Sequence, residues 1–288
     1  MLAPVCFALS NVVDNHVLHA RLRDPISYNI LATWPTLPVA VAIFFTWKVS
    51  FAFDAWFVGT AIGFAFAFLF ILYNMAMMRE QGTNVVSVLY VSPLFVAVLA
   101  AVFLGESLSF VNYVGIMLLV LSAFLVLYKR IDTKNLALGL ILAYALGSAV
   151  ARVAAKSALE NVDVWSYFFW FLVGGLVGTG LLGVLWAKGL AGALGILDSR
   201  LTLLVLTTSG VSTIGLWLLY TAFSLGPVAI ASGLTAIQPT LVFLYTIVLI
   251  RFRPDAIPHE RVTGRWANVR KVVAVVLIVV GVFALTAA

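Results

Sequence analysis

Long apolar runs alternate with short polar breaks along almost the whole chain. A helix needs about 20 mostly apolar residues to cross the hydrocarbon core of a bilayer. Runs of this kind predict ten transmembrane helices, at roughly 3–20, 26–47, 54–78, 84–104, 109–128, 135–157, 164–187, 200–223, 228–250 and 269–287. The breaks carry turn-forming residues, such as those from Glu80 to Asn84 and the pair Gly226 and Pro227. We therefore expect an all-α membrane protein with no soluble domain.

The second half of the chain repeats landmarks of the first half in the same order. The matched pairs are Asp24 with Asp163, Tyr28 with Tyr167, Tyr73 with Tyr220, Pro93 with Pro239 and Phe124 with Phe283. Their spacing grows in steps at the predicted loops around 188–199 and 251–268, where insertions are tolerated. Chance recurrence of apolar residues is the alternative, but the ordered spacing favours a duplication. We predict a first five-helix repeat at residues 1–131 and a second at residues 132–288.

The odd number of spans in each copy means that the two copies enter the membrane from opposite sides. Inverted repeats of this kind are typical of secondary transporters, whose substrate site lies between the repeats near the bilayer midplane. Two small-residue pairs, Gly59 with Gly63 and Gly174 with Gly178, indicate close helix packing. Tyr28, like Trp165 and Tyr167, stands at the start of a span, where tyrosine and tryptophan mark the membrane interface.

Composition supports a lipid environment. The chain is 64% hydrophobic and 10% charged, whereas a soluble domain carries about 25% charged residues. One cysteine, Cys6, excludes an intrachain disulfide. The start of the chain lacks the basic region and cleavage site of a signal peptide. The first span begins almost at residue 1, which leaves open whether native residues precede it.

The net charge of +6 is an orientation signal. Most lysines and arginines follow odd-numbered spans, with a cluster from Arg251 to Lys271. Cytoplasmic loops are enriched in these residues, so the charge pattern favours cytoplasmic odd loops and outside termini. We expect no nucleic-acid partner, although the cluster could touch anionic lipids.

The most specific stretch runs from Gly82 to Ser87, through Tyr90 to Pro93, and on to Glu106. It resembles the fourth helix of the EamA-like ten-helix exporters of the drug/metabolite transporter superfamily, with a mid-helix proline and an acidic residue at the exit. The counterpart in the second half runs from Gly226 to Gln238 and Pro239, but Arg251 and Arg253 stand where an acidic residue would match Glu106. The family is usually drawn with cytoplasmic termini, so the orientation stays open.

The resemblance implies a central cavity surrounded by spans 1, 3, 4, 6, 8 and 9, with spans 5 and 10 at the periphery. Members of the family export amino acids and other small metabolites, or exchange sugars and nucleotide sugars, often with a proton gradient as the drive.

Asp14 is the leading functional candidate, because an ionisable group inside a span costs about 2.5–3.5 kcal/mol on insertion scales and usually faces a cavity. Burial favours the neutral form of a carboxyl group, which suits proton coupling. His16, close by in the same span, is a second candidate for proton transfer. The alternative for Asp14 is a structural, permanently charged carboxylate paired with Arg152. Arg152 is itself either a ligand for a substrate anion or a side chain that extends to the headgroups.

Paired polar positions in the two halves are where a site between repeats draws its residues. The residues expected to contact the substrate are Asn11, Asp14, Asn15, Tyr73, Asn74, Ser87, Tyr90, Arg152, Tyr220 and Gln238. Ordinary hydrogen bonding between helices is the alternative for each of them.

These patterns predict a secondary active transporter, an exporter of a small polar metabolite such as an amino acid, that works by alternating access with protons as the expected coupling ion. A passive facilitator or channel, or a nucleotide-sugar or drug transporter of the same fold, is the alternative. We expect no enzyme activity, no metal and no cofactor: the chain has three histidines and no phosphate-binding loop. The expected partners are the substrate, protons and membrane lipids, in a plasma (bacterial inner) membrane. Oligomeric state stays open.

Overall fold

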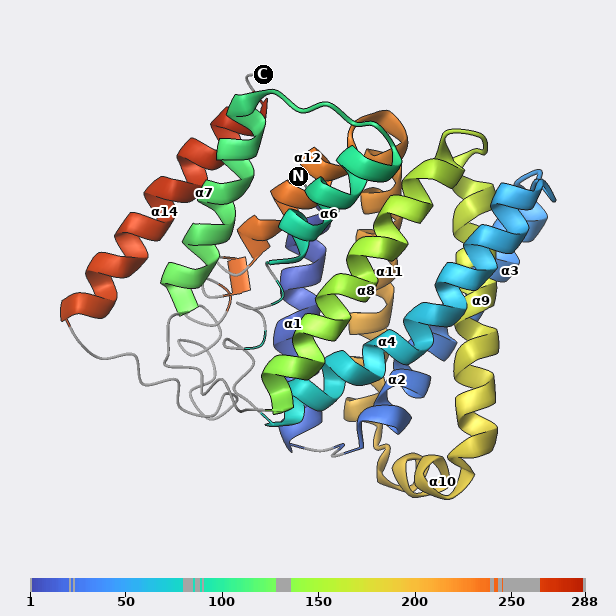
Figure 1. The fold of residues 1–288 in the computed structure, drawn as a ribbon. Helices are drawn as coiled ribbons and strands as arrows, with labels where there is room; N and C mark the ends of the chain where they lie inside the picture. The colour runs from blue at the N-terminus through green and yellow to red at the C-terminus, as the bar shows by residue number, and fades with distance from the viewer. Residues whose placement is uncertain are drawn as a thin grey trace.

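The computed structural model describes residues 2–20, 22, 24–79, 85, 89, 91–127, 136–238, 241–242, 245 and 265–286. Secondary structure in this part of the chain is helical throughout, with no strand (Figure 1). Five of its helical stretches are long and apolar enough to cross a membrane, and shorter apolar helices accompany them. The prediction of an all-α membrane protein is confirmed.

The described elements fall on the ten predicted apolar runs, with one addition. They are α1 (Leu2–Ala20), α2 (Pro25–Thr33), η1 (Trp34–Thr36), α3 (Leu37–Thr46), η2 (Asp54–Val58), α4 (Gly59–Arg79), α6 (Ser92–Phe103), α7 (Phe110–Leu127), α8 (Leu136–Leu159), α9 (Val164–Leu185), α10 (Ala187–Ile196), α11 (Ser199–Leu225), α12 (Val228–Leu234), η3 (Thr235–Ile237) and α14 (Arg265–Thr286). The second run consists of α2, η1 and α3, and the third of η2 and α4.

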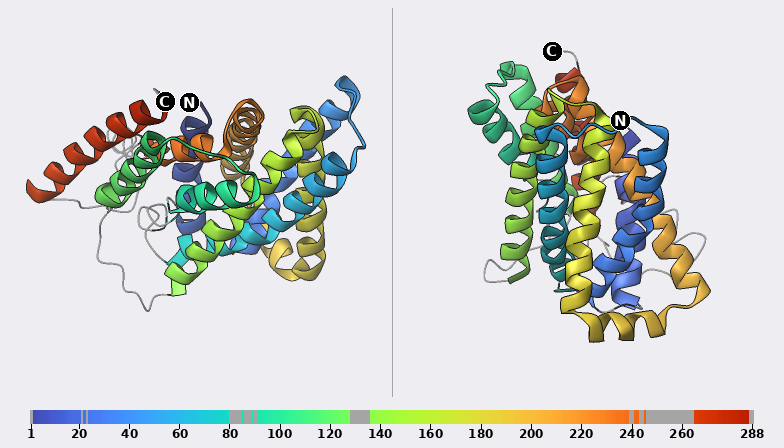
Figure 2. Two further views of the ribbon diagram at one scale, coloured as in Figure 1. Left: turned by 45° about the horizontal axis from the view of Figure 1, so that its top comes forward. Right: turned by 90° about the vertical axis from the view of Figure 1, so that its right-hand side faces the viewer.

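The predicted loop at 188–199 was wrong, because most of it forms α10. This helix lies across one end of the bundle (Figures 1 and 2). Its ten residues are too few to span a membrane. Its alanines and leucines favour a helix, and Asp198 then begins α11 by accepting a hydrogen bond of 2.6 Å from the backbone N–H of Leu201. We call the end of the bundle that carries α10 the α10 face.

The α4–α9 contact depends on glycines, as the sequence predicted from its small-residue pairs. A Cβ atom on Gly63 would lie 2.0 Å from the carbonyl oxygen of Phe171, and one on Gly174 would lie 2.1 Å from that of Thr60. The two backbones touch because neither glycine has a side chain.

The other main helix contacts keep the same pattern when each span is replaced by the equivalent span of the other predicted repeat, five spans away. α1 packs against α11, so the first span contacts the eighth. α8 packs against α4, so the sixth span contacts the third, which is the equivalent pair after this replacement. α7 packs against α14 at one edge of the bundle, and α6 against α12, which pairs the fifth span with the tenth and the fourth with the ninth (Figures 1 and 2). An inverted duplication predicts this pairing. The boundary between residues 131 and 132 lies outside the described residues and stays a prediction.

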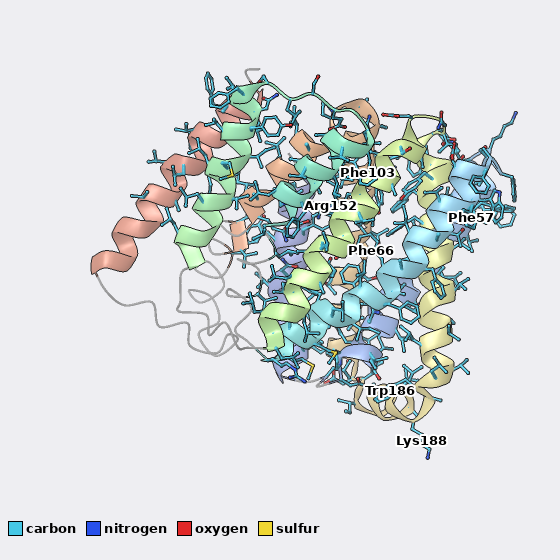
Figure 3. All side chains as sticks on the ribbon, in the orientation of Figure 1. Phe57, Phe66, Phe103, Arg152, Trp186 and Lys188 are labelled. Atoms are coloured by element: carbon cyan, nitrogen blue, oxygen red, sulfur yellow. The ribbon has the colours of Figure 1, made fainter. Side chains whose placement is uncertain are left out.

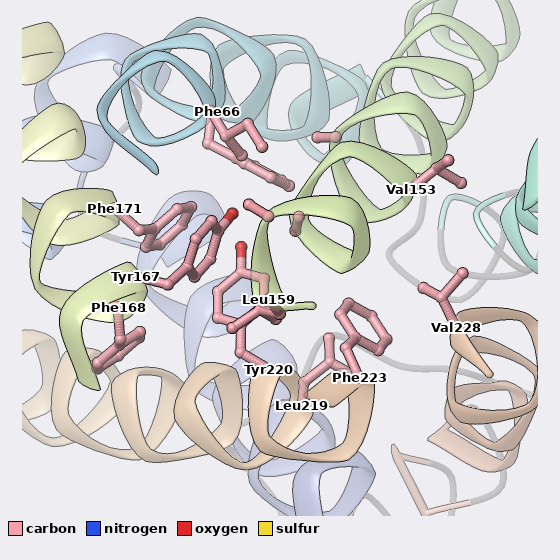
Figure 4. Close-up of a cluster of buried hydrophobic side chains, with 14 of the residues drawn as sticks. Phe66, Val153, Leu159, Tyr167, Phe168, Phe171, Leu219, Tyr220, Phe223 and Val228 are labelled. Carbon is pink, nitrogen blue, oxygen red and sulfur yellow. The ribbon is translucent and has the colours of Figure 1, made fainter. Parts of the chain in front are cut away.

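A cluster of buried aromatic rings lies where α9 meets α11 (Figure 4). The rings of Tyr167 and Tyr220 are 5.0 Å apart, and those of Phe171 and Tyr220 are 5.2 Å apart. The interfacial position predicted for Tyr28 and Tyr167 was therefore wrong: they are 3% and 0% exposed. Each ring points into the bundle near a helix start, so position along the chain did not reveal its direction.

Candidate functional site

A cavity of about 120 Å³ lies inside the bundle between α1, α2, η1, α4, α9 and α11. The polar residues that line it are Asp14, Tyr28, Asn29, Thr33, Thr36, Tyr73, Asn74, Thr208, Ser209, Ser212 and Thr213. Phe66, Phe70 and Phe171 supply aromatic walls. The volume equals that of about four water molecules in the liquid, so the cavity has room for a small molecule or for one end of a larger one.

Among the described residues that line the cavity, Asp14 is the one whose side chain can carry a formal charge at neutral pH. Its Oδ1 atom accepts a hydrogen bond of 2.8 Å from the hydroxyl of Thr208 on α11, and another from the phenol of Tyr28 on α2. Thr208 also approaches the backbone oxygen of Ser10 at 3.4 Å, one turn before Asp14 on α1. Hydroxyl donors of this kind stabilise a buried carboxylate without neutralising it. The carboxylate therefore keeps its capacity to bind a proton or a cation.

Tyr73 and Asn74 line the same cavity from α4. The Tyr73 hydroxyl donates a hydrogen bond of 3.2 Å to Oδ1 of Asn11, and the Asn74 amide donates one of 3.4 Å to the carbonyl oxygen of Pro25. The amide nitrogen of Asn11 is buried and has no hydrogen-bond partner among the described residues. These contacts join α4 to α1 and to the start of α2.

Most hydroxyl and amide groups on the cavity walls already donate hydrogen bonds to backbone carbonyl oxygens. Thr33 donates to Asn29 at 2.8 Å and Thr213 to Ser209 at 2.7 Å, each along its own helix. The Ser209 hydroxyl donates across helices to the carbonyl of Ala32 at 2.5 Å. A hydroxyl whose hydrogen is used in this way still offers lone pairs. The cavity therefore presents mainly hydrogen-bond acceptors and aromatic faces to a ligand.

Arg152, Tyr220 and Gln238 do not line this cavity. Arg152 lies on α8, away from the α10 face (Figure 3), and its guanidinium interacts electrostatically with the phenols of Tyr144 and Tyr220. Tyr220 is buried in the aromatic cluster, where its hydroxyl points toward that of Tyr167 (Figure 4). Gln238 is 6% exposed at the end of η3.

Four other sequence candidates fall wholly or by their side chains outside the described residues. The side chains of Asn15 and His16 lie outside the part of the chain that the structure describes, as do Ser87 and Tyr90. Among the described residues, no three His, Cys, Asp or Glu side chains gather into a group that could hold a metal ion.

Several wall residues were absent from the sequence candidates, above all Tyr28, Asn29, Thr208 and Ser209. Spans 2 and 7, which hold α2 and α9, border this cavity although the family resemblance did not include them. The recurrence of Tyr28 as Tyr167 in the second half was a signal for Tyr28 that the interfacial interpretation set aside. The hydroxyl-rich stretch from Thr207 to Thr213 in an apolar helix was a signal for α11.

Comparison with known proteins gives a family match over the first part of the chain and a shared fold. Residues 1–128 match the model of the EamA-like transporter family. No curated protein matches the chain. A solved crystal structure, described only as that of a protein, shares 17% sequence identity with a TM-score of 0.61, over 99% of this chain and 98% of that chain. At this identity the likeness concerns the fold alone.

Proposed function

We propose that the chain is a membrane transporter of the drug/metabolite transporter superfamily, to which the EamA-like family that matches residues 1–128 belongs. Within that superfamily it would be a secondary active exporter of a small metabolite with an amino group, such as an amino acid. The observation that carries this proposal is the acceptor-rich cavity around Asp14. Its carboxylate, its hydroxyl oxygens and its three phenylalanine faces match the donors and the positive charge of an ammonium group.

Proton coupling follows from competition for one carboxylate. Asp14 can hold either a proton or the substrate's ammonium group, because both require the same oxygens. A transporter that releases its substrate when Asp14 takes up a proton exchanges one for the other across the membrane. The export direction rests on the family, and the exchange would proceed by rocking of the two predicted inverted repeats about the cavity.

A ligand-binding screen on the purified protein tests the substrate class. A ligand that binds only the folded state raises the melting temperature, roughly by 5 °C at 100 times its Kd for a chain of this size. We expect amino acids to raise it, and the matching 2-oxo acids, which lack the ammonium group, to leave it unchanged. Stabilisation by neutral sugars or nucleotide sugars with none from amines would overturn the proposal in favour of the alternative substrate classes.

Flux measurements in proteoliposomes separate the carrier from a passive facilitator. A carrier shows counterflow, in which unlabelled substrate inside drives uptake of labelled substrate, and its rate saturates. A channel conducts without either property, and that result would contradict alternating access.

A further inference from the structure

The helices α2, η1 and α3 run antiparallel to α9, and a tryptophan joins the two at each end. On the α10 face the indole N–H of Trp186, which follows α9, donates a hydrogen bond of 2.8 Å to Oδ2 of Asp24. On the opposite face the indole N–H of Trp47, which follows α3, donates one of 3.1 Å to Oδ1 of Asp163. Each aspartate begins the helix of one span, and each tryptophan ends the other span.

In both contacts the aspartate also caps the helix that follows it. Asp24 caps α2 through the backbone N–H of Ile26 at 3.1 Å and also accepts from the hydroxyl of Ser27. Asp163 caps α9 through the backbone N–H of Ser166 at 3.0 Å and accepts from the Ser166 hydroxyl at 2.6 Å. Asp24 and Asp163 are a repeated pair of the sequence, and a serine follows each of them three residues later. The repeat therefore places one charge-assisted indole contact at each membrane face.

The cavity lies between these two contacts along the same pair of spans. Tyr28, Asn29 and Thr33 line it from α2, and Phe171 and Gly175 line it from α9. A substrate that leaves between these two spans must pass one contact or the other. Both contacts are formed in this structure, on either side of a cavity of about 120 Å³.

We propose that the Trp186–Asp24 and Trp47–Asp163 contacts are the two gates of the transporter, of which one opens at a time. The proposal rests on the alternating-access part of the proposed function. The four residues position the helices and touch no substrate.

The two faces are not equally secured. On the face opposite α10, the backbone N–H of Ser50 donates to the hydroxyl oxygen of Ser166 at 2.8 Å, and the indole of Trp170 donates to the Ser50 carbonyl at 2.9 Å. Asn161 also donates a bond of 3.0 Å to Asp54. Because these bonds add to the Trp47 contact, we expect the Trp186 gate to respond more strongly to the loss of its indole N–H.

Gly189 of α10 offers a way to open one gate without changing either partner. A Cβ atom at this position would lie 2.1 Å from Nε1 of Trp186 and 3.0 Å from Oδ2 of Asp24. Gly189→Ala therefore displaces the indole from the carboxylate. Gly192, in the same helix, has open space around its Cα, so Gly192→Ala is the matched control.

The test measures access to the cavity from each face and needs no substrate. Ser212, a cavity residue, is replaced by cysteine in a Cys6→Ser background. Its reaction with a membrane-impermeant thiol reagent is followed in right-side-out and in inside-out vesicles. Trp186→Phe and Gly189→Ala should raise the rate from the α10 face roughly three- to tenfold, with no rise from the other face. Trp47→Phe should raise it only from the opposite face, and by less.

Gly192→Ala and Trp56→Phe, which alters an exposed tryptophan outside both contacts, should stay within about twofold of the parent. Equal increases from both faces in every variant would mean that the contacts only stabilise the fold, and unchanged rates would mean that they gate nothing. Either result overturns the proposal. If face-selective labelling is found but no amino compound binds, the gates stand and the proposed substrate class fails.

Discussion

The hydroxyl of Thr208 on α11 donates a hydrogen bond of 2.8 Å to Oδ1 of Asp14 on α1. The two residues belong to different predicted repeats, so a carboxylate inside the membrane is shared between the halves of the protein. Any movement of one repeat against the other changes the surroundings of this carboxylate. The charge state of Asp14 and the arrangement of the two repeats are therefore expected to depend on each other.

Asp14→Asn removes the charge and the titration while it keeps the size and one acceptor oxygen. We expect transport driven by a proton gradient to be abolished. Counterflow exchange should persist with an affinity lower by about tenfold, which corresponds to roughly 1.4 kcal/mol. Proteoliposomes with and without an imposed gradient measure both quantities. Unchanged gradient-driven transport would reject Asp14 as the coupling group.

Tyr28→Phe removes the second hydroxyl that Asp14 accepts from and keeps the ring. The loss of one donor to a buried charged acceptor costs about 1–3 kcal/mol. We therefore expect the transport rate to fall by about tenfold or more. Tyr113→Phe is the control, because Tyr113 is 38% exposed on α7 and is not a cavity residue. Equal losses in the two variants would show that the effect does not come from the Asp14 site. The measurement is initial counterflow rate at matched protein incorporation.

The spans could be read from the sequence because the bilayer sets their length. The run expected at 135–157 is α8, Leu136–Leu159, and the run expected at 164–187 contains α9, Val164–Leu185. The helix α10 was missed because its ten residues are too few to cross the membrane. Its place across the end of the bundle depends on the neighbouring spans.

The site was only partly readable, for a different reason. Asp14 stood out because a charge inside a span is costly. Thr208 did not, since a hydroxyl in a span usually bonds its own helix, as Thr213 does with Ser209. Only the tertiary contact distinguishes Thr208. The share of the cavity wall that comes from α9 depends on how closely α4 and α9 approach at Gly63, which a linear pattern does not specify.

That approach predicts a strong and selective sensitivity to added methyl groups. Gly63→Ala and Gly174→Ala each push a Cβ atom into a backbone carbonyl of the opposite helix, and the backbone cannot move aside as a flexible side chain does. We expect each to lower the free energy of unfolding by about 1–3 kcal/mol. Gly180→Ala, on the same helix as Gly174 but with open space around it, should be neutral or gain up to about 1 kcal/mol. Thermal unfolding in detergent compares the three, and a loss in Gly180→Ala equal to the others would contradict the contact argument.

Glu106 connects the two halves through a helix end. Its carboxylate accepts hydrogen bonds of 2.8 Å and 3.4 Å from the backbone N–H groups of Val228 and Ala229, the first residues of α12. Pro227 precedes them at the cap position and makes no side-chain hydrogen bond there, so Glu106 supplies the cap from another span. Glu106→Ala should therefore destabilise the protein by about 0.5–2 kcal/mol and speed amide hydrogen exchange at Val228 and Ala229. Glu160→Ala is the control: its carboxylate is exposed and pairs with Lys156 at 3.6 Å, and a surface pair of this kind contributes about 0–1 kcal/mol. If exchange at α12 is the same in both variants, the cap contributes nothing to holding the halves together.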